Sequence, residues 1–242
     1  MKALAVDLGG SHATCAVVED EAVLSAERIS LEGALGLEGA LPLFEGALAR
    51  VAATAGAQTS DCAGLALGFC GIVNPETGRV LSTNAKYEDA PGIDLPAWAR
   101  MALGVELRIE NDARLALLGE RFAGAARGCD DVVMVTLGTG IGGVAMIGGR
   151  LLQGRHHQAG LLGGHLTGVH QGRLCTCGNV GCVEAEASTW ALPGVCRSWP
   201  GFEGSALAAA PRLDFETLFA AAGEGDAVAV EVRDRCLGLW AA

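Results

Sequence analysis

The sequence predicts an α/β protein, because two kinds of segment alternate along the chain. Short apolar runs bounded by glycine or polar residues are typical of buried strands. Stretches with apolar residues three and four positions apart are typical of helices. Two segments, residues 4–20 and 132–149, also share one pattern: apolar strand, glycine-rich turn with a hydroxyl residue, apolar strand. We therefore expect two related domains, residues 1–113 and 114–242, within the 242 residues.

The first half of the chain begins with two apolar runs, residues 3–10 and 13–20, that predict strands joined by a glycine-rich turn. Residues 41–57 carry apolar side chains at helical spacing and predict a helix. Residues 62–73 form an unbroken apolar run, which predicts one buried strand. Asn74 and the proline after it then start a turn that Gly78 closes.

The second half continues the alternation. Residues 105–112 predict a short strand that ends in polar residues, and residues 113–126 predict the helix after it. Residues 130–152 predict a strand, a glycine-rich turn and a second strand. Residues 185–199 begin as a helix that a Pro-Gly pair weakens, and residues 214–242 are helical with a break at a pair of glycines.

Composition excludes several classes of protein. The formal net charge is −11, and no basic run is present, so nucleic acid is not expected as a partner. The first ten residues do not resemble a signal peptide, because Asp7 interrupts a short apolar stretch. No apolar run reaches the roughly 18 residues of a membrane span. We expect a cytoplasmic protein that does not enter membranes.

The nine cysteines fall into two groups. Six are scattered singly in apolar surroundings, and we expect them to be buried thiols in a reducing cytoplasm. They are Cys15, Cys62, Cys70, Cys129, Cys196 and Cys236. The other three lie within eight positions of one another and need a separate explanation.

Two glycine turns are candidates for binding phosphate. In the first, Asp7 precedes Gly9, Gly10 and Ser11; successive backbone N–H groups can cradle a phosphoryl group, and the carboxylate can hold a hydrated Mg²⁺. An ordinary hairpin turn is the alternative for such a short motif. The second turn contains Gly138, Thr139 and Gly140 between two apolar strands. Two such turns at comparable places predict a nucleotide whose phosphates are bound by both.

Asn111 and Asp112 stand at the end of a predicted strand, just before a helix. Both residue types are common N-caps, so capping is the alternative to a chemical role, and each residue can have a different role. A carboxylate at the carboxyl end of a strand beside a phosphate site is placed to accept a hydroxyl proton. Phosphoryl transfer needs little beyond positioning, a metal and such a base.

The crowded cysteines predict a structural zinc site. Cys175, Cys177 and Cys182 supply three sulfurs, and His165, ten residues before the first, supplies a nitrogen. Zinc prefers this tetrahedral mixture of thiolate and imidazole, and four protein ligands leave no open position for catalysis. A disulfide is disfavoured by the compartment and by the Cys-x-Cys separation. A loop without metal is the remaining alternative; His156, His157 and His170 are alternative nitrogen donors.

In this order, the motifs resemble the ROK family of repressors, open reading frames and sugar kinases. "LAVDLGGSHATCAVV" and "LGTGIGG" look like its two phosphate motifs, "IENDARLALLGE" like its catalytic segment, and "GHLTGVHQGRLCTCGNVGCVEAEAS" like its zinc motif. The resemblance implies the actin-like, ribonuclease H-like ATPase fold with two domains flanking a cleft. It also implies ATP, Mg²⁺ and structural Zn²⁺ as cofactors, and a homodimer or homotetramer.

The resemblance assigns further roles. Asp112 would be the catalytic base. The expected sugar contacts are Asn84, Asn111, His165 and Glu184, with His165 also binding zinc. The implied activity is an ATP-dependent, glucokinase-like transfer of the γ-phosphoryl group to a hexose hydroxyl. That hydroxyl is expected to be the 6-OH of a glucose-like sugar or an N-acetylhexosamine.

Three departures from the family pattern stand out. Leu162 occupies the position of a glutamate that grips the sugar, and His12 stands where Lys or Asn is common. The family also continues past a helix like residues 228–242 into a strand and a closing helix, so we expect the C-terminal domain here to be truncated. These departures leave open an alternative function, a catalytically inactive sugar-binding sensor. A DNA-binding repressor is disfavoured, because a strand begins at about residue 3 and leaves no room for a preceding helix-turn-helix domain.

Overall fold

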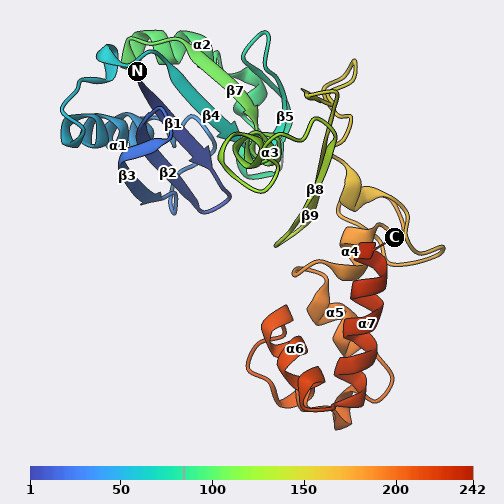
Figure 1. The fold of residues 1–242 in the computed structure, drawn as a ribbon. Coiled ribbons are helices and arrows are strands. Elements are labelled where there is room, and N and C mark those ends of the chain that lie inside the picture. The colour runs from blue at the N-terminus through green and yellow to red at the C-terminus, as the bar shows by residue number, and fades with distance from the viewer. Residues whose placement is uncertain (84, 242) are drawn as a thin grey trace. The chain divides into compact units, whose positions relative to one another are not determined.

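The computed structural model describes residues 1–83 and 85–241 (Figure 1). By compactness the chain divides into two units. Unit 1 comprises residues 1–132 and 147–159, and unit 2 comprises residues 133–146 and 160–242. The predicted division at residue 113 differs from this one, because it assigns the helix that begins at Asp112 to the second domain; it stays a prediction.

Unit 1 is built on a five-stranded sheet in the order β3-β2-β1-β4-β7 (Figure 1). β1 pairs antiparallel with β2 and parallel with β4, and β4 pairs parallel with β7. The strands of unit 1 are β1 (Lys2–Leu8), β2 (His12–Glu19), β3 (Ala22–Ser30), β4 (Leu65–Phe69), β5 (Gly71–Asn74), β6 (Arg79–Thr83), β7 (Leu107–Asn111) and β10 (Arg150–Leu151). The α-helices of this unit are α1 (Leu41–Thr54), α2 (Leu95–Trp98) and α3 (Asp112–Ala123).

The core of unit 1 forms where the helices cover this sheet. α1 buries Phe44, Ala47, Leu48 and Val51, which lie on one face at helical spacing, and it packs against β1, β2 and β3. α3 packs against β4 and β7. Complete burial of a large apolar side chain contributes about 1.5–3 kcal/mol, so this core is the main source of stability in the unit.

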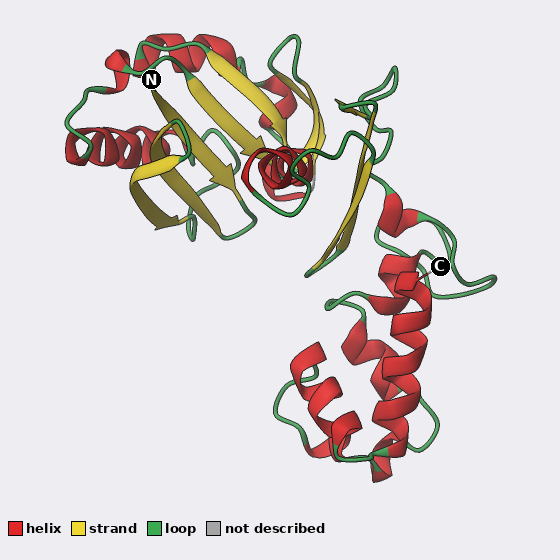
Figure 2. Cartoon of the chain, viewed as in Figure 1, coloured by secondary structure: helices red, strands yellow, loops and turns green. Residues whose placement is uncertain are grey.

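Unit 2 combines a β-hairpin with a helical group (Figure 2). The hairpin consists of β8 (Val132–Leu137) and β9 (Ile141–Ile147), apart from their outermost residues. The helices are α4 (Val183–Ala187), α5 (Leu192–Arg197), α6 (Phe215–Gly223) and α7 (Ala227–Ala241). α7 packs against the other three, and its buried residues Ala229, Val232 and Cys236 lie on one face. The loop that carries the clustered cysteines connects β10 to α4 by way of residues 152–182.

The structure confirms the α/β class and most predicted elements, and it corrects three. Residues 62–73 form two strands: β4 stays in the main sheet, and β5 leaves it to pair with β6. β3 was not predicted, because nearly all its side chains are exposed or half-buried and it lacks an apolar run. Pro193 lies in the first turn of α5, where its missing N–H costs nothing, so it starts a helix there.

Two of the scattered cysteines also differ from the prediction. Cys129 is exposed and Cys70 is half-buried, whereas the other four thiols are buried as expected. Burial raises the pKa of Cys15, Cys196 and Cys236 to about 11. These three thiols therefore stay protonated near neutral pH and behave as small apolar side chains.

Candidate functional site

The first glycine turn joins β1 to β2 in unit 1. Asp7 is the penultimate residue of β1 and its side chain is exposed. The N–H of Gly9 donates to the carbonyl of His12 at 3.0 Å, which closes the turn. The turn is also held from a distant segment: the hydroxyl of Tyr87 donates to the carbonyl of Gly9 at 2.7 Å, and the ammonium of Lys86 donates to the carbonyl of Gly10. The turn is thus fixed on its carbonyl side.

Asn111 caps α3, so the capping alternative holds for this residue. Its Oδ1 accepts a hydrogen bond from the Arg114 N–H at 3.2 Å. Its Nδ2 donates to the carbonyl of Gly71 at 3.0 Å and to Asp112 Oδ1 at 2.9 Å. Both amide hydrogens therefore have acceptors within the chain, and the group left for a ligand is the second lone pair of Oδ1.

Asp112 is the first residue of α3 and lies at the same end of the parallel strands as Asp7. Burial raises the pKa of the Asp112 carboxyl, the backbone N–H of Ala113 opposes that shift, and the negative charge of Asp7 raises the pKa further. The two carboxylates thus interact electrostatically at the carboxyl edge of β1, β4 and β7. A carboxylate with a raised pKa is a better proton acceptor than an ordinary aspartate.

A buried network next to Asp112 was not predicted. The Arg114 side chain is fully buried, pairs with Glu110 at 3.3 Å and donates to the carbonyls of Leu152, His157 and Ala159 at 3.0–3.1 Å. Glu110 also accepts from the side chain of Gln153 at 2.8 Å. Residues 152–159 are therefore anchored to the helix that carries Asp112. Sequence alone gave no signal, because arginine in a helix usually lies on the surface.

The second glycine turn joins β8 to β9 in unit 2. The N–H of Gly138 donates to the carbonyl of Gly140 at 3.0 Å, so this amide serves the turn itself. Thr139 is exposed at the tip. Both predicted phosphate turns are therefore real hairpin turns, one in each unit, as the repeated pattern predicted. Their role in binding phosphate stays a prediction.

The predicted metal ligands meet in unit 2. One ligand atom from each of His165, Cys175, Cys177 and Cys182 lies within 4.8 Å of the others. The Sγ atoms of Cys177 and Cys182 are 3.7 Å apart, and Cys175 Sγ lies 3.6 Å from Nδ1 of His165. A tetrahedral zinc ion with Zn–S bonds of about 2.3 Å requires an S···S separation of roughly 3.8 Å. The donor set and its spacing fit zinc, with all four positions filled by protein.

The backbone of the cysteine loop has a conformation that brings the four ligands close together. Gly181 has φ of +77°, and a Cβ there would lie 1.8 Å from the carbonyl oxygen of Val169, so only glycine fits. A hydrogen bond from the backbone N–H of Asn179 lowers the pKa of Cys177, whereas burial raises the pKa of Cys182 to about 12. Metal binding supplies the positive charge that ionises such a buried thiol.

A second buried ion pair supports this loop. Glu186 on α4 is 2% exposed and pairs with Arg235 on α7 at 2.6 Å. Its other carboxylate oxygen accepts from the backbone N–H of Arg173, which lies in the cysteine loop. Glu186 thus connects the loop to α7. This pair could not be predicted from the sequence, because its two members are 49 residues apart.

The remaining predicted residues have different surroundings. Glu184, on α4, is half-buried, and its carboxylate accepts from the backbone N–H of Ile141 at 2.9 Å. Leu162 is 44% exposed just before the short helical turn that contains His165. His12 is the first residue of β2, and its Nδ1 lies 2.9 Å from Oγ of Ser11. Asn84 lies outside the described residues.

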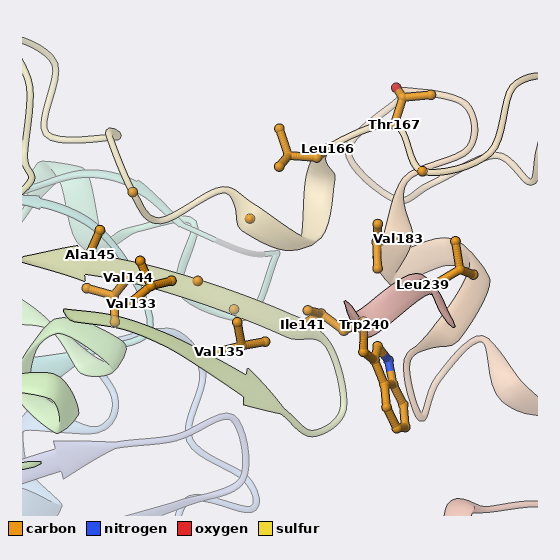
Figure 3. A pocket seen from close by; sticks show the side chains of 15 residues that line it. Val133, Val135, Ile141, Val144, Ala145, Leu166, Thr167, Val183, Leu239 and Trp240 are labelled. Carbon is orange, nitrogen blue, oxygen red and sulfur yellow. The ribbon is translucent and has the colours of Figure 1, made fainter. Parts of the chain in front are cut away.

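The predicted site residues divide between the two units. Unit 1 brings together the first turn, Asn111 and Asp112, and unit 2 brings together the second turn, Glu184 and the metal ligands. Unit 2 also contains a cavity of about 550 Å³, lined mainly by apolar side chains such as Val135, Leu166 and Trp240 (Figure 3). None of the predicted site residues is among the residues that line this cavity, whose side chains are mainly apolar.

Comparison with known proteins gives concordant matches. The sequence pattern of the ROK family matches residues 3–242. A glucokinase from Thermotoga maritima is 32% identical over 241 residues, which are 97% of this chain and 74% of that protein. Among solved structures, the ROK hexokinase from Thermus thermophilus has a TM-score of 0.77 and 30% identity over 98% of this chain and 74% of its own.

A second solved relative carries ligands. The ROK family glucokinase from Streptomyces griseus, in complex with glucose and AMPPNP, has a TM-score of 0.73 and 29% identity, covering 98% of this chain and 75% of its own. The chain thus spans about three quarters of the length of these relatives. The family resemblance and the actin-like ATPase fold expected from the motifs are confirmed: this chain belongs to the ROK family.

Proposed function

We propose that this chain is an ATP-dependent hexose kinase. The observation that carries the proposal is the carboxylate of Asp112, which has a raised pKa and stands beside Asp7 and the first glycine turn. The glucokinase and hexokinase relatives, one of them in complex with glucose and AMPPNP, support the same function. The two glycine turns are proposed to bind the phosphates of ATP.

In the proposed reaction, Asp112 accepts the proton of a sugar hydroxyl while that oxygen attacks the γ-phosphorus of ATP. A bond forms between the hydroxyl oxygen and phosphorus, the bond to the β–γ bridging oxygen breaks, and ADP leaves with that electron pair. The exposed Asp7 carboxylate would hold Mg²⁺, whose chemistry is to neutralise charge on the phosphates. Oδ1 of Asp112 accepts hydrogen bonds from Asn111 and from the backbone N–H of Ala113, both at 2.9 Å.

The identity of the sugar is less closely defined by the site residues than the identity of the nucleotide. Asn111, His165 and Glu184 are proposed sugar contacts, and Asn84 is a further one. Leu162 cannot accept a hydroxyl hydrogen bond, and a buried sugar hydroxyl without a partner costs about 1–3 kcal/mol. The proposed substrates are therefore a glucose-like hexose or an N-acetylhexosamine, phosphorylated at the 6-OH, with weaker binding than a carboxylate at position 162 would give.

The cysteine cluster has a structural role in this proposal. Zinc bound by His165, Cys175, Cys177 and Cys182 has no open coordination position and takes no part in the chemistry. We further propose a homodimer or homotetramer, and the cytoplasm as the location. No helix within the described part of the chain combines the length and apolar character that a bilayer span requires.

The test is a coupled assay of ADP release with a panel of hexoses and N-acetylhexosamines. We expect turnover with at least one sugar, and we expect Asp112→Asn to lower kcat by about 10²–10⁴-fold while sugar binding persists. Asp20→Asn is the matched control, because Asp20 is exposed in the turn that follows β2. Substantial activity in Asp112→Asn would remove this residue as the base.

Two observations favour a second candidate function, a sugar-binding sensor without catalysis. Leu162 stands where the family resemblance implies a carboxylate, and a ROK family transcriptional regulator resembles this chain with a TM-score of 0.80 and 28% identity, covering 97% of this chain and 59% of its own. Sugar binding measured by calorimetry, together with no ADP release for any sugar in the panel, would favour the sensor.

A further inference from the structure

The second glycine turn is held by the segment that follows α4. The backbone N–H of Thr189 donates to the carbonyl of Gly138 at 3.2 Å, and that of Trp190 donates to the carbonyl of Thr139 at 3.1 Å. In a trans peptide the C=O of one residue and the N–H of the next point in opposite directions. These two bonds therefore direct the N–H groups of Thr139 and Gly140 away from the segment and toward the open side of the turn.

Glu184 completes this support from within α4. Its Oε2 accepts from the N–H of Ile141 at 2.9 Å, and its Oε1 lies 3.4 Å from the indole nitrogen of Trp190, which donates to it. A Cβ on Gly140 would lie 2.5 Å from Oε2, so the missing side chain of this glycine allows the carboxylate to approach. A carboxylate acceptor forms a stronger hydrogen bond to an N–H than a neutral one does.

These contacts give Glu184 a second role, in addition to the sugar contact proposed for it. Both of its oxygens are engaged with residues of the turn and of the segment that holds the turn. We propose that Glu184 is a positioning residue for the phosphate turn: it holds residues 138–141 in the conformation in which the N–H groups of Thr139 and Gly140 receive the phosphates of a nucleotide. This inference rests on the proposed kinase function for the identity of the ligand.

The position of α4 makes the proposal specific. α4 begins directly after Cys182, so the helix that presents Glu184 starts at the last cysteine of the cluster. Glu186, two residues further on, is paired with Arg235 on α7. The helix that carries Glu184 is thus attached to the cysteine cluster at its first residue and to α7 through Glu186. These two attachments hold the Glu184 carboxylate in place as a hydrogen-bond acceptor for the turn.

The first test is amide hydrogen exchange, which needs no nucleotide and no activity. Glu184→Ala removes the acceptor of the Ile141 N–H, and we expect this amide to exchange at least about tenfold faster. Glu184→Gln retains an oxygen at the same place, so we expect exchange within about threefold of the unchanged protein. Glu216→Ala, an exposed glutamate on α6, is the matched control. Unchanged exchange at Ile141 in Glu184→Ala would overturn the proposal.

The second test separates nucleotide from sugar by calorimetry with Mg·AMPPNP and with glucose. Positioning of the turn predicts that Glu184→Ala weakens nucleotide binding about tenfold and that Glu184→Gln restores it to within about threefold. If both variants weaken sugar binding and leave nucleotide binding unchanged, Glu184 is a sugar contact alone and the positioning proposal is wrong. If the unchanged protein binds no nucleotide, the kinase proposal fails by itself, and the exchange experiment still decides whether Glu184 holds the turn.

Discussion

The two units hold equivalent glycine turns by different means. In unit 1 the turn follows β1, a central strand of a five-stranded sheet, and two side chains from residues 86–87 bind its carbonyls. In unit 2 the turn follows β8, the terminal strand of its sheet, and backbone groups and Glu184 from the segment after the cysteine cluster bind it. The turn in unit 1 thus depends on two side chains from one distant segment, and the turn in unit 2 depends on the segment that follows the cysteine cluster.

The largest difference in stability between the two units is expected when metal is removed. Zinc binding contributes on the order of 10 kcal/mol in small structural sites, so a strong chelator should destabilise unit 2 and leave unit 1 protected. Hydrogen exchange in peptides from each unit measures this directly, beside a metal analysis of the purified protein. Equal loss of protection in both units, or a folded protein that contains no zinc and is insensitive to chelator, would contradict the comparison.

The next test concerns the buried ion pair of unit 2. Arg235→Met leaves the carboxylate of Glu186 buried without its cation, and breaking a buried pair costs about 3–5 kcal/mol. Denaturant unfolding should show this loss. Arg233→Met is the control on the same helix, because Arg233 pairs with Asp234, which is 58% exposed, and such surface pairs contribute about 0–1 kcal/mol. Equal losses in the two variants would show that burial does not matter here.

A smaller effect is expected in unit 1. Tyr87→Phe removes the hydroxyl that donates to the Gly9 carbonyl and leaves the ring packed near Phe69, with ring centroids 5.9 Å apart. Loss of one such hydrogen bond costs about 0.5–1.5 kcal/mol, because water can replace part of it. Thermal unfolding and exchange at the amides of the first turn measure the change. A loss of more than about 3 kcal/mol would mean that unit 1 depends on this one hydrogen bond as strongly as unit 2 depends on its buried ion pair.

The smallest effect is a shift in titration. Because the charge of Asp7 raises the pKa of Asp112, Asp7→Asn should lower that pKa, though not to its ordinary value, since burial is the larger cause. Asp112 acts as a base only when its carboxyl is ionised. Turnover should therefore fall as the pH falls through the raised pKa of Asp112. Carbon-13 NMR of the aspartate carboxyls measures the titration without turnover. An unchanged or higher pKa in Asp7→Asn would remove the interaction between the two carboxylates.

Features that depend on residues close together in the sequence were predicted correctly. The metal ligands lie within eighteen positions, and their types are chemically specific, so the cluster could be predicted with its one histidine and three cysteines. The turn from Asn74 to Gly78 was also predicted, and the carbonyl of Asn74 accepts from the N–H of Gly78 at 2.9 Å. The break between α6 and α7 followed from glycines at residues 223 and 225.

What sequence could not predict depends on residues far apart in the chain. Arg114 is bound by carbonyls 38 to 45 positions away, and Glu184 accepts from an amide 43 positions away. Neither the burial of an arginine nor the engagement of a glutamate leaves a local pattern. β3 was missed although its partner β2 is its neighbour along the chain. Its pairing with β2 is made by backbone groups, which every residue has, so its side chains carry no pattern that predicts a strand.

β8 has one further consequence. Val133, Val135 and Leu137 are 77%, 52% and 52% exposed on this strand, which pairs with β9 on one side and ends its sheet within the described residues. An apolar strand with an open edge is a template for another extended chain. Pairing of this edge with another chain is an association between molecules, so its extent rises with protein concentration. The same folded molecule is therefore less prone to aggregate in dilute solution than at high concentration.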